Sequence, residues 1–323
     1  MLKKVIVLPI LILISFSLII ITIPMEFISN SLSTYDTISE HWENKYTPSS
    51  PSSIEILNLN VDIGNIKIKY IDPPVNYYLK IDVYIEMSGK HLAGKSYLDY
   101  FNIIWQDESS QVNFTVEFIS DEWFESSLWF LQNVSIVVNI KKDVVLSIIT
   151  ELKDGDFEIT VPFGVSIGDL KTIVSKGNLF YNFERCTIEG NITGITNEGD
   201  LELKSYNVEY TQNSNWMFNS NDTYVEIYQS IEMGANITGT AIISTGMIDL
   251  FYHDTTADIG ALFPFPLSSW LIPLTQPGFE YTILDKGFFY KSNDFPTKNY
   301  YNISFYHLGG PPARNHHIEI KSE

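Results

Sequence analysis

Six histidines are the side chains best suited to binding a transition metal: His41, His91, His253, His307, His316 and His317. His316 and His317 are adjacent, and His253 precedes Asp254. A structural or catalytic zinc site needs three or four ligands at a characteristic spacing. Neither group has such a third or fourth ligand nearby, so the sequence predicts no metal site and no cofactor.

Acidic residues flank two glycines, in Asp154-Gly155-Asp156 and in Glu198-Gly199-Asp200. Carboxylates on neighbouring turns are the oxygen ligands that calcium prefers. The nonapeptide repeat that binds calcium in repeat toxins is absent, however, and we interpret these residues as polar turns.

For catalysis, the sequence contains neither a His-Glu-x-x-His helix nor a Gly-x-Gly-x-x-Gly loop. Two or three carboxylates at one point in space would suffice for a glycosidase or a polysaccharide lyase. Acidic residues are numerous, at 39 Asp and Glu. We predict a protein that is not an enzyme and has no catalytic residues, with a carbohydrate-active enzyme as the alternative.

Six Asn-x-Ser/Thr sequons are candidate glycosylation sites: Asn113, Asn133, Asn191, Asn221, Asn236 and Asn302. With a net charge of −19, the chain repels nucleic acid, so we expect no nucleic-acid partner. Cys186 is the only cysteine, and packing rather than an internal disulfide must therefore stabilise the fold.

The first 25 residues have the pattern of a membrane segment. Lys3 and Lys4 precede an apolar run from Val5 to Ile23, which as a helix covers about 28 Å, close to the hydrocarbon thickness of a bilayer. No small-residue cleavage pattern follows. The positive-inside rule then predicts a signal-anchor over residues 1–25 and a cell-membrane protein with its body outside the cytoplasm. The alternative is a secreted protein that loses this segment.

Residues 26–53 are rich in Ser, Thr and Pro, and we expect them to form a stalk. From Ile54 onward the apolar residues alternate with polar ones, as in Ile54–Val61, Ile66–Tyr70 and Leu79–Ile85. Alternation with a period of two predicts strands that bury one face.

A repeat organises the region from residue 54 to 255. Glycine turns recur at Gly155, Gly177, Gly199 and Gly246, each before an alternating strand, and an earlier copy surrounds Gly64. Asn191-Ile192-Thr193-Gly194 also recurs as Asn236-Ile237-Thr238-Gly239. A spacing near 22 residues predicts an all-β solenoid, in which each unit buries its apolar face on its neighbours. An antiparallel meander or β-sandwich is the alternative, because two short strands with their turns have the same length.

These turns resemble those of the “putative adhesin” family of bacterial and archaeal surface domains of unknown function. The family signature is a recurring Gly-[Asn/Asp]-hydrophobic-x-hydrophobic turn on a short right-handed β-helix, matched here at Gly64, Gly155, Gly177 and Gly199. The resemblance covers about residues 54–255. It implies a binding or structural role and supplies no catalytic residues.

Residues 256–323 contain the apolar stretch 259–274, which three prolines interrupt. We expect this part to cap the end of the repeat, because solenoid ends expose apolar edges. The whole sequence therefore predicts a membrane-anchored, adhesin-like protein that contacts the membrane through residues 5–23 and binds carbohydrate or protein without catalysis. A structural envelope component is the alternative to binding, and the oligomeric state is left open.

Overall fold

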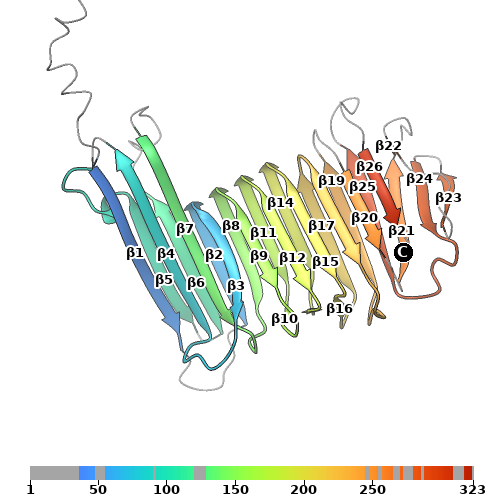
Figure 1. The fold of residues 1–323 in the computed structure, drawn as a ribbon, viewed down its shortest axis with the longest axis horizontal. Helices are drawn as coiled ribbons and strands as arrows, with labels where there is room; N and C mark the ends of the chain where they lie inside the picture. Colours follow the sequence, from blue (N-terminus) through green and yellow to red (C-terminus); the bar gives the residue numbers. More distant parts are fainter. Residues whose placement is uncertain are drawn as a thin grey trace, which may run out of the picture.

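The computed structural model describes residues 36–47, 55–89, 92–108, 110–119, 129–243, 248–253, 257–264, 270–271, 279–284, 287–307 and 316–321. Within these ranges the chain consists of strands and turns, and the one helical element is the 3-10 helix η1 (Tyr97–Asp99). The predicted all-β class is confirmed. The body is elongated, and its strands run across the long axis (Figure 1).

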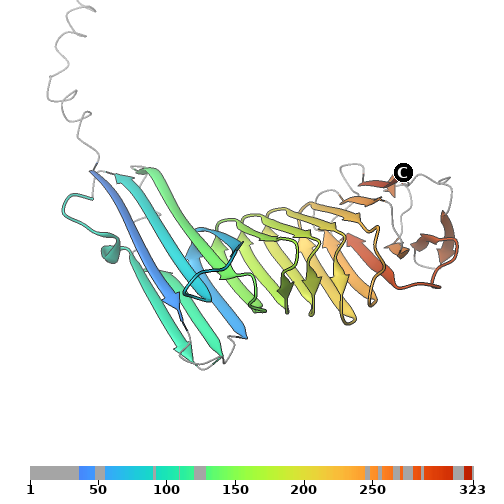
Figure 2. The same ribbon diagram turned by 60° about the horizontal axis from the view of Figure 1, so that its bottom comes forward.

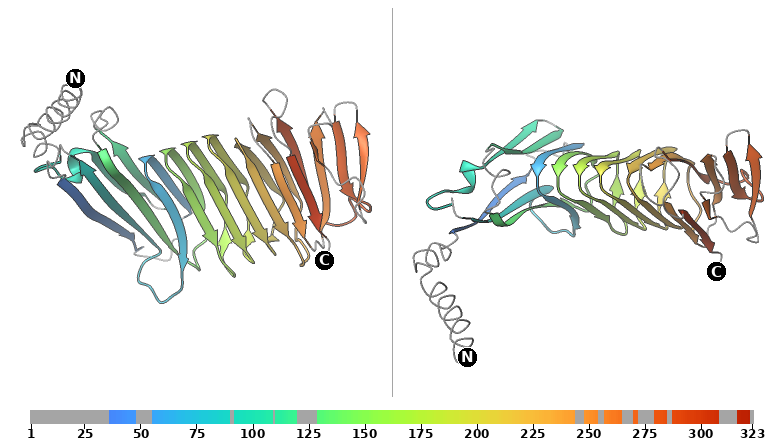
Figure 3. Two further views of the ribbon diagram at one scale, coloured as in Figure 1. Left: turned by 45° about the horizontal axis from the view of Figure 1, so that its top comes forward. Right: turned by 90° about the horizontal axis from the view of Figure 1, so that it is seen from above.

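Two large sheets form the body, and Figure 3 shows them as two layers. The first has eleven strands, in the spatial order β1 (Asp36–Tyr46), β4 (Leu79–Gly89), β7 (Trp129–Lys141), β3 (Asn65–Ile71), β9 (Phe157–Val161), β12 (Leu179–Glu184), β15 (Leu201–Tyr206), β18 (Thr223–Tyr228), β20 (Ile248–His253), β26 (His316–Lys321) and β22 (Trp270–Leu271).

The second sheet has twelve strands, in the spatial order β23 (Phe279–Leu284), β24 (Gly287–Ser292), β21 (Asp258–Pro264), β25 (Tyr300–His307), β19 (Ile237–Ile243), β17 (Ser214–Ser220), β14 (Ile192–Glu198), β11 (Leu170–Lys176), β8 (Ser147–Asp154), β2 (Ile56–Ile63), β6 (Gln111–Phe118) and β5 (Phe101–Glu108). A third, narrow sheet contains β10 (Ser166–Ile167), β13 (Thr187–Ile188) and β16 (Glu209–Tyr210).

In the middle of the molecule, successive segments of the chain each add one parallel strand to each of the two large sheets (Figure 2). We call each such segment a coil, and the set of coils the stack. Leu170 pairs in parallel with Ile148 on one side and with Ile192 on the other, so partners lie 22 residues apart. Strands of the first sheet pair at the same interval, because Leu179 pairs with Phe157 on one side and with Leu201 on the other. Alternate side chains point inward and are buried. A repeat length of 22 residues therefore sets the register in both sheets over these strands, and it lengthens to 24 residues between Asn191 and Asn215.

The upstream glycine turn belongs to this stack. β2 pairs in parallel with β8, and β3 pairs in parallel with β9, across a sequence separation of 91 residues. The residues between β3 and β8 contribute antiparallel pairs, β4 with β1 and β7, and β5 with β6. An insertion within the repeat thus builds the N-terminal end of the body.

β1 corrects the predicted stalk, because residues 36–46 form a strand inside the range 26–53. Ile38 and Tyr46 are buried and Trp42 packs against the core. Glu40 and Asn44 share the face of these residues and are only partly buried. These two polar residues hide the alternation that would have predicted the strand.

The C-terminal part, predicted as a cap over residues 256–323, joins both sheets as further strands. β21 pairs with the hairpin β23–β24 at the end of the second sheet. Residues 265–269 and 272–278, within the apolar stretch on which the cap was predicted, lie outside the described residues. The predicted repeat turn at Gly246 also lies outside them.

Two glycines make room for large aromatic side chains in the core. A Cβ atom on Gly194 would lie 2.9 Å from the Tyr181 ring, and one on Gly239 would lie 3.1 Å from the Trp216 Cβ atom. Tyr181 and Trp216 are both buried. The repeated Asn-Ile-Thr-Gly tetrapeptide therefore marks coils that pack around an aromatic residue.

No helix among the described residues is long and apolar enough to cross a membrane. This finding corrects the predicted localisation, a single-pass cell-membrane protein with its body outside the cytoplasm, because no described helix supplies the span on which that prediction rests. Residues 5–23, on which the anchor was predicted, lie outside the described residues.

Candidate functional site

The repeat glycines form a column in which each backbone touches the next. A Cβ atom on Gly155 would lie 2.2 Å from the Gly64 carbonyl oxygen, and one on Gly177 would lie 2.0 Å from that of Gly155. A Cβ atom on Gly199 would lie 1.9 Å from the Gly177 carbonyl oxygen, so Gly199 continues the column. Gly64, Gly155 and Gly177 also have φ between 134° and 143°, a region that other residues rarely adopt. At these contacts a Cβ atom would overlap the backbone of the neighbouring turn, so glycine is needed there, whereas the next equivalent position is Asn221, whose N–H donates to the Gly199 carbonyl.

Beside this column, Asn and Asp side chains link successive turns. Asn65 Oδ1 accepts a hydrogen bond from the Asp156 N–H at 2.9 Å, and Asp156 Oδ1 accepts one from the Asn178 N–H at 2.8 Å. Asn178 Oδ1 in turn accepts from the Asp200 N–H at 3.0 Å. The turns Asp154-Gly155-Asp156 and Glu198-Gly199-Asp200, which were considered as calcium sites, therefore take part in hydrogen bonds between coils.

A second ladder occupies another corner and includes two of the sequons. Asn191 Oδ1 accepts from the Asn215 N–H at 2.9 Å, and its Nδ2 donates to Asp169 Oδ1 at 3.2 Å. Asn236 Oδ1 accepts from the Tyr300 N–H at 3.2 Å. These two sequon asparagines thus hold adjacent coils together.

The other four sequons lie at separate places. Asn113 Oδ1 accepts hydrogen bonds from the side chains of Asn58 and Gln111. Asn133 is exposed on β7, and Asn221 and Asn302 are partly buried. Glycosylation at these asparagines stays a prediction.

The outward face of four central strands gathers aromatic and charged side chains. We call this surface the aromatic platform; it lies on β9, β12, β15 and β18 and comprises Glu158, Thr160, Phe180, Asn182, Glu184, Glu202, Lys204, Tyr206, Tyr224, Glu226 and Tyr228. Parallel pairing places these residues in straight columns, such as Glu158, Phe180, Glu202 and Tyr224.

The rings of the platform are ordered by contact with one another and with cations. Tyr206 and Tyr228 stack with their ring centroids 4.5 Å apart and an interplanar angle of 10°. The Arg185 guanidinium lies 5.4 Å from the Tyr206 centroid, and Lys204 Nζ lies 5.8 Å from that of Tyr224. Phe180 and Tyr206 are each 37% exposed, so part of each ring is accessible to a ligand.

Charged groups of the platform are paired. Lys204 Nζ lies 2.6 Å from Glu202 Oε1, and this hydrogen bond raises the pKa of Lys204. The Tyr224 hydroxyl donates to Glu226 Oε2 at 3.0 Å. Rings and polar groups therefore alternate across one flat surface.

Two shallow hollows lie on the platform. One of about 330 Å³ is lined by Phe180, Glu202 and Tyr224 together with Asn178, Asp200 and Asp222 of the first ladder. The other, of about 350 Å³, is lined by Thr160, Asn182 and Lys204 among others. Burial raises the pKa of Asp200, and the nearby carboxylate of Asp222 raises it further.

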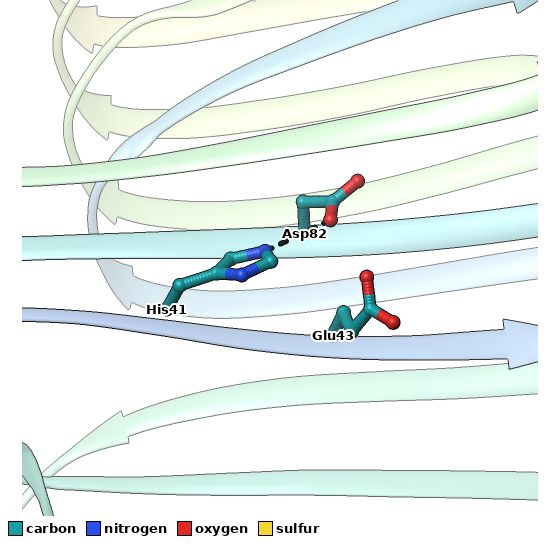
Figure 4. A group of neighbouring side chains, drawn as sticks. All are labelled: His41, Glu43 and Asp82. Atoms are coloured by element: carbon teal, nitrogen blue, oxygen red, sulfur yellow. Dashed lines mark hydrogen bonds and ion pairs between the residues drawn. The ribbon is translucent and has the colours of Figure 1, made fainter.

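A second polar cluster, in the antiparallel end, was missed because its members are far apart in the sequence. His41, Glu43 and Asp82 offer ligand atoms that all lie within 4.8 Å of one another (Figure 4). His41 Nε2 lies 2.9 Å from Asp82 Oδ1, and the imidazole stacks on Tyr84 with centroids 4.6 Å apart.

A lysine already supplies the positive charge in this cluster. Lys80 Nζ lies 2.7 Å from Asp82 Oδ1 and 2.9 Å from Glu43 Oε2. Hydrogen bonds to Asp82 and then Glu43 raise the pKa of Lys80, while those from Lys80 and Lys45 lower the pKa of Glu43. The donor set suits a metal by type, but Lys80 bridges both carboxylates and Lys45 Nζ lies 3.3 Å from Glu43 Oε1, so we interpret the cluster as an ion-pair network between β1 and β4.

Two sequence spacings match catalytic motifs, although no catalytic residues were predicted from the sequence. Gly89–Ser96 fits the phosphate-binding loop pattern Gly-x-x-x-x-Gly-Lys-Ser, and Gly164–Gly168 fits the nucleophile elbow pattern Gly-x-Ser-x-Gly.

Neither match has the structure that its chemistry needs. Lys95 and Ser96 precede only the three-residue helix η1, with Lys95 Nζ 3.9 Å from Asp99 Oδ1, whereas a phosphate loop opens a full helix. Ser166 lies in the two-residue strand β10, and its parallel partner β13 lies in the next coil, whereas an elbow turns from strand to helix.

No family model matches this sequence, and no curated protein matches it. Among solved structures, the chain is similar to a putative cell adhesion protein from Clostridium sporogenes, with 13% identity, a TM-score of 0.36, and coverage of 88% of this chain and all of that one. A putative adhesin from Bacteroides fragilis matches with 9% identity, a TM-score of 0.33, and coverage of 89% and 97%. A putative lipid binding protein from Parabacteroides distasonis matches with 12% identity, a TM-score of 0.30, and coverage of 88% and 97%.

The first two descriptions agree with the family that the glycine turns resemble. Scores this low carry no argument about function, which must rest on the geometry of this chain.

Proposed function

We propose that this chain is an adhesin-like binding protein that holds a carbohydrate chain on the aromatic platform without catalysing a reaction. The stacked rings of Tyr206, which is 37% exposed, and Tyr228, which is partly buried, set beside the Lys204–Glu202 pair, are the observation that carries this proposal. Aromatic faces supply apolar contact area at low cost in side-chain entropy, and neighbouring polar groups hydrogen-bond hydroxyls.

The proposal includes a short β-solenoid as the scaffold. Parallel pairing at intervals of 22 residues and the two Asn/Asp ladders support this scaffold. Four adjacent parallel strands span roughly 14 Å at about 4.8 Å per interval, which gives an extended ligand several equivalent contact points. A flat, repetitive surface suits a repetitive polymer better than a small molecule, which needs a deeper pocket.

The test is binding of the purified protein to an array of polysaccharides, followed by a titration with the best one. The double variant Tyr206→Ala/Tyr228→Ala should weaken binding at least tenfold. Phe163→Ala removes a ring that is 72% exposed and outside the platform, and it should leave affinity unchanged. Equal affinity of the double variant and the unaltered protein would refute the platform.

A second candidate function is hydrolysis or elimination of a polysaccharide, and one observation favours it. Asp200 and Asp222 line the same hollow, and burial raises the pKa of Asp200 toward that of a general acid. Incubation of the polysaccharides with the protein, followed by analysis of the products, separates the two functions. Chain shortening that disappears in Asp200→Asn would establish an enzyme, whereas binding with intact polymer would exclude this candidate.

A further inference from the structure

The coil that contains β25 is supplied out of sequence order. In the second sheet β25 lies between β19 and β21, although it follows both in the chain. The first sheet repeats this arrangement, with β26 between β20 and β22. In each sheet, therefore, the chain skips one strand position, and a strand from later in the sequence occupies it.

β25 fits this place as closely as a core strand. Tyr301, Ile303 and Phe305 are at most 1% exposed. The Tyr301 ring lies 5.8 Å from that of Trp216, and its hydroxyl donates to Gln229 Oε1 at 3.3 Å. Seven consecutive residues of β25 pair with β19.

A set of polar contacts recognises the segment just before β25. Asp258 is 1% exposed, and its Oδ2 atom accepts hydrogen bonds from the backbone N–H groups of Thr297 at 2.6 Å and Lys298 at 3.0 Å. The Asp258 N–H donates to the Asn299 carbonyl at 3.1 Å. Asn299 Nδ2 donates to the Met233 carbonyl, so the contacts come from both neighbouring coils.

Until this segment arrives, β19 presents an unpaired edge above an apolar coil. Such an edge is a template for any strand of suitable sequence. Its partner strand in the same chain lies 64 residues away, because Tyr300 bonds to Asn236 across that separation. A second copy carries the same strand, and exchange of identical elements replaces every contact with an equivalent one.

We propose that residues 294–307 are an exchangeable donor strand, and that the place between β19 and β21 takes this strand from a second copy of the chain. Copies joined in this way share one continuous coil at the junction. Exchange competes with insertion from the same chain, so its extent rises with protein concentration.

Two single-cysteine variants of the full chain test this proposal. Thr240 and Ser304 are directly paired across β19 and β25, and both are only partly buried on the outer face. We mix Thr240→Cys with Ser304→Cys, denature and refold them together at increasing concentration, and oxidise. A disulfide between these variants forms only when β25 of one copy lies beside β19 of the other. We expect a heterodimer band whose yield rises at least tenfold across the concentration series.

The matched control is Met217→Cys mixed with Thr240→Cys. Met217 and Thr240 are also directly paired, but β17 and β19 are neighbours in the second sheet in chain order, so no strand position between them is skipped. Burial raises the pKa of the native Cys186 to about 12, so this thiol stays unreactive in the folded state. The double variant Thr240→Cys/Ser304→Cys should form its disulfide at low concentration, which verifies the pairing. If the heterodimer yield of the Thr240→Cys and Ser304→Cys mixture does not exceed that of the Met217→Cys control at any concentration, the proposal is overturned.

Discussion

The coil stack and the antiparallel end of the molecule are held in register by different means. In the stack, residues 147–243, strands pair in parallel with strands 22 to 24 residues away, and the same glycine and Asn/Asp contacts recur at each turn. In the antiparallel end, β4 pairs with β1 and β7, and side-chain contacts such as that of His41 with Asp82 span 41 residues. A local rule applied repeatedly builds the first region, whereas one particular set of long-range contacts builds the second.

This difference predicts where each region is vulnerable. A change at one repeated turn of the stack acts on the backbone contact between two coils, which side-chain movement cannot relieve. A change in the antiparallel end acts on side chains, which have more freedom to adjust. The following substitutions are arranged from the largest expected effect to the smallest.

Gly177→Ala should have the largest effect. Its Cβ atom would lie 2.0 Å from the Gly155 carbonyl oxygen, so the two coils must separate. We expect a loss of about 4 kcal/mol or more in the free energy of unfolding, measured by denaturant titration, or no folded protein.

Gly164→Ala is the control for backbone conformation. Gly164 has φ +76°, yet a Cβ atom there would have no neighbour within 4 Å. This variant should lose only about 1 kcal/mol. Equal losses in the two variants would mean that φ, and not contact between the coils, makes glycine necessary.

Lys80→Met tests the antiparallel end. It leaves the Asp82 carboxylate, whose side chain is 5% exposed, without the ammonium 2.7 Å away, although His41 and Asn139 still contact it. We expect a loss of about 3 kcal/mol at pH 7. Hydrogen exchange should then quicken in β1 and β4 and stay unchanged in the stack.

The pH dependence of this loss follows from Glu43. Its pKa is lowered, chiefly by Lys80, so the pair stabilises the fold above the ordinary value of 4.5 and loses that effect as the pH falls through the lowered pKa. The gap between Lys80→Met and the unaltered protein should therefore narrow in acid. Lys45→Met, which breaks an ion pair whose two side chains are 43% and 44% exposed, should leave the free energy of unfolding nearly unchanged. A cost equal to that of Lys80→Met would contradict the network.

The same contrast explains how far the sequence could be interpreted. Gly155, Gly177 and Gly199 indicate coils directly, because a repeat of fixed length has one parallel register. The ion-pair network could not be predicted, since nothing in the sequence aligns His41 with Asp82 before the pairing of β1 and β4 is known. The return of β25 was also hidden, because nothing in the sequence shows that β25, and not the earlier β21, pairs with β19.

The functional surface was predictable only in part. Alternation assigns Tyr206 and Tyr228 to outward positions of their strands. Their stacking required the register, which sets them directly opposite each other across β15 and β18. Repeat length therefore carries information about neighbouring side chains that no single strand contains.

Asn178→Ala should have an intermediate effect within the stack. The substitution removes an acceptor for the Asp200 N–H and a donor to Asp156 Oδ1, while the backbone contact between the glycines remains. We expect a loss of about 1.5 kcal/mol in denaturant titration. Asn182→Ala, on the exposed face of β12, the strand that follows Asn178, is the control and should change stability by less than about 0.5 kcal/mol. If Asn178→Ala changed stability as little as this control does, the side-chain ladder would add little stability beyond that of the strand pairing.

Asp200→Asn should have the smallest effect, and in the opposite direction. The raised pKa of Asp200 means that its charged form is less favourable in the folded protein than in the unfolded chain. The resulting cost is absent below the ordinary value of 3.8 and grows as the pH rises through the raised pKa. The amide keeps a carbonyl acceptor for the ladder and carries no charge, so the melting temperature should rise by about 1 °C at pH 7 and not at pH 3. Asp222→Asn should give part of the same gain, because it removes the second charge. A lower melting temperature for both variants at pH 7 would mean that these carboxylates stabilise the stack as anions, and that charge as well as hydrogen bonding connects its coils.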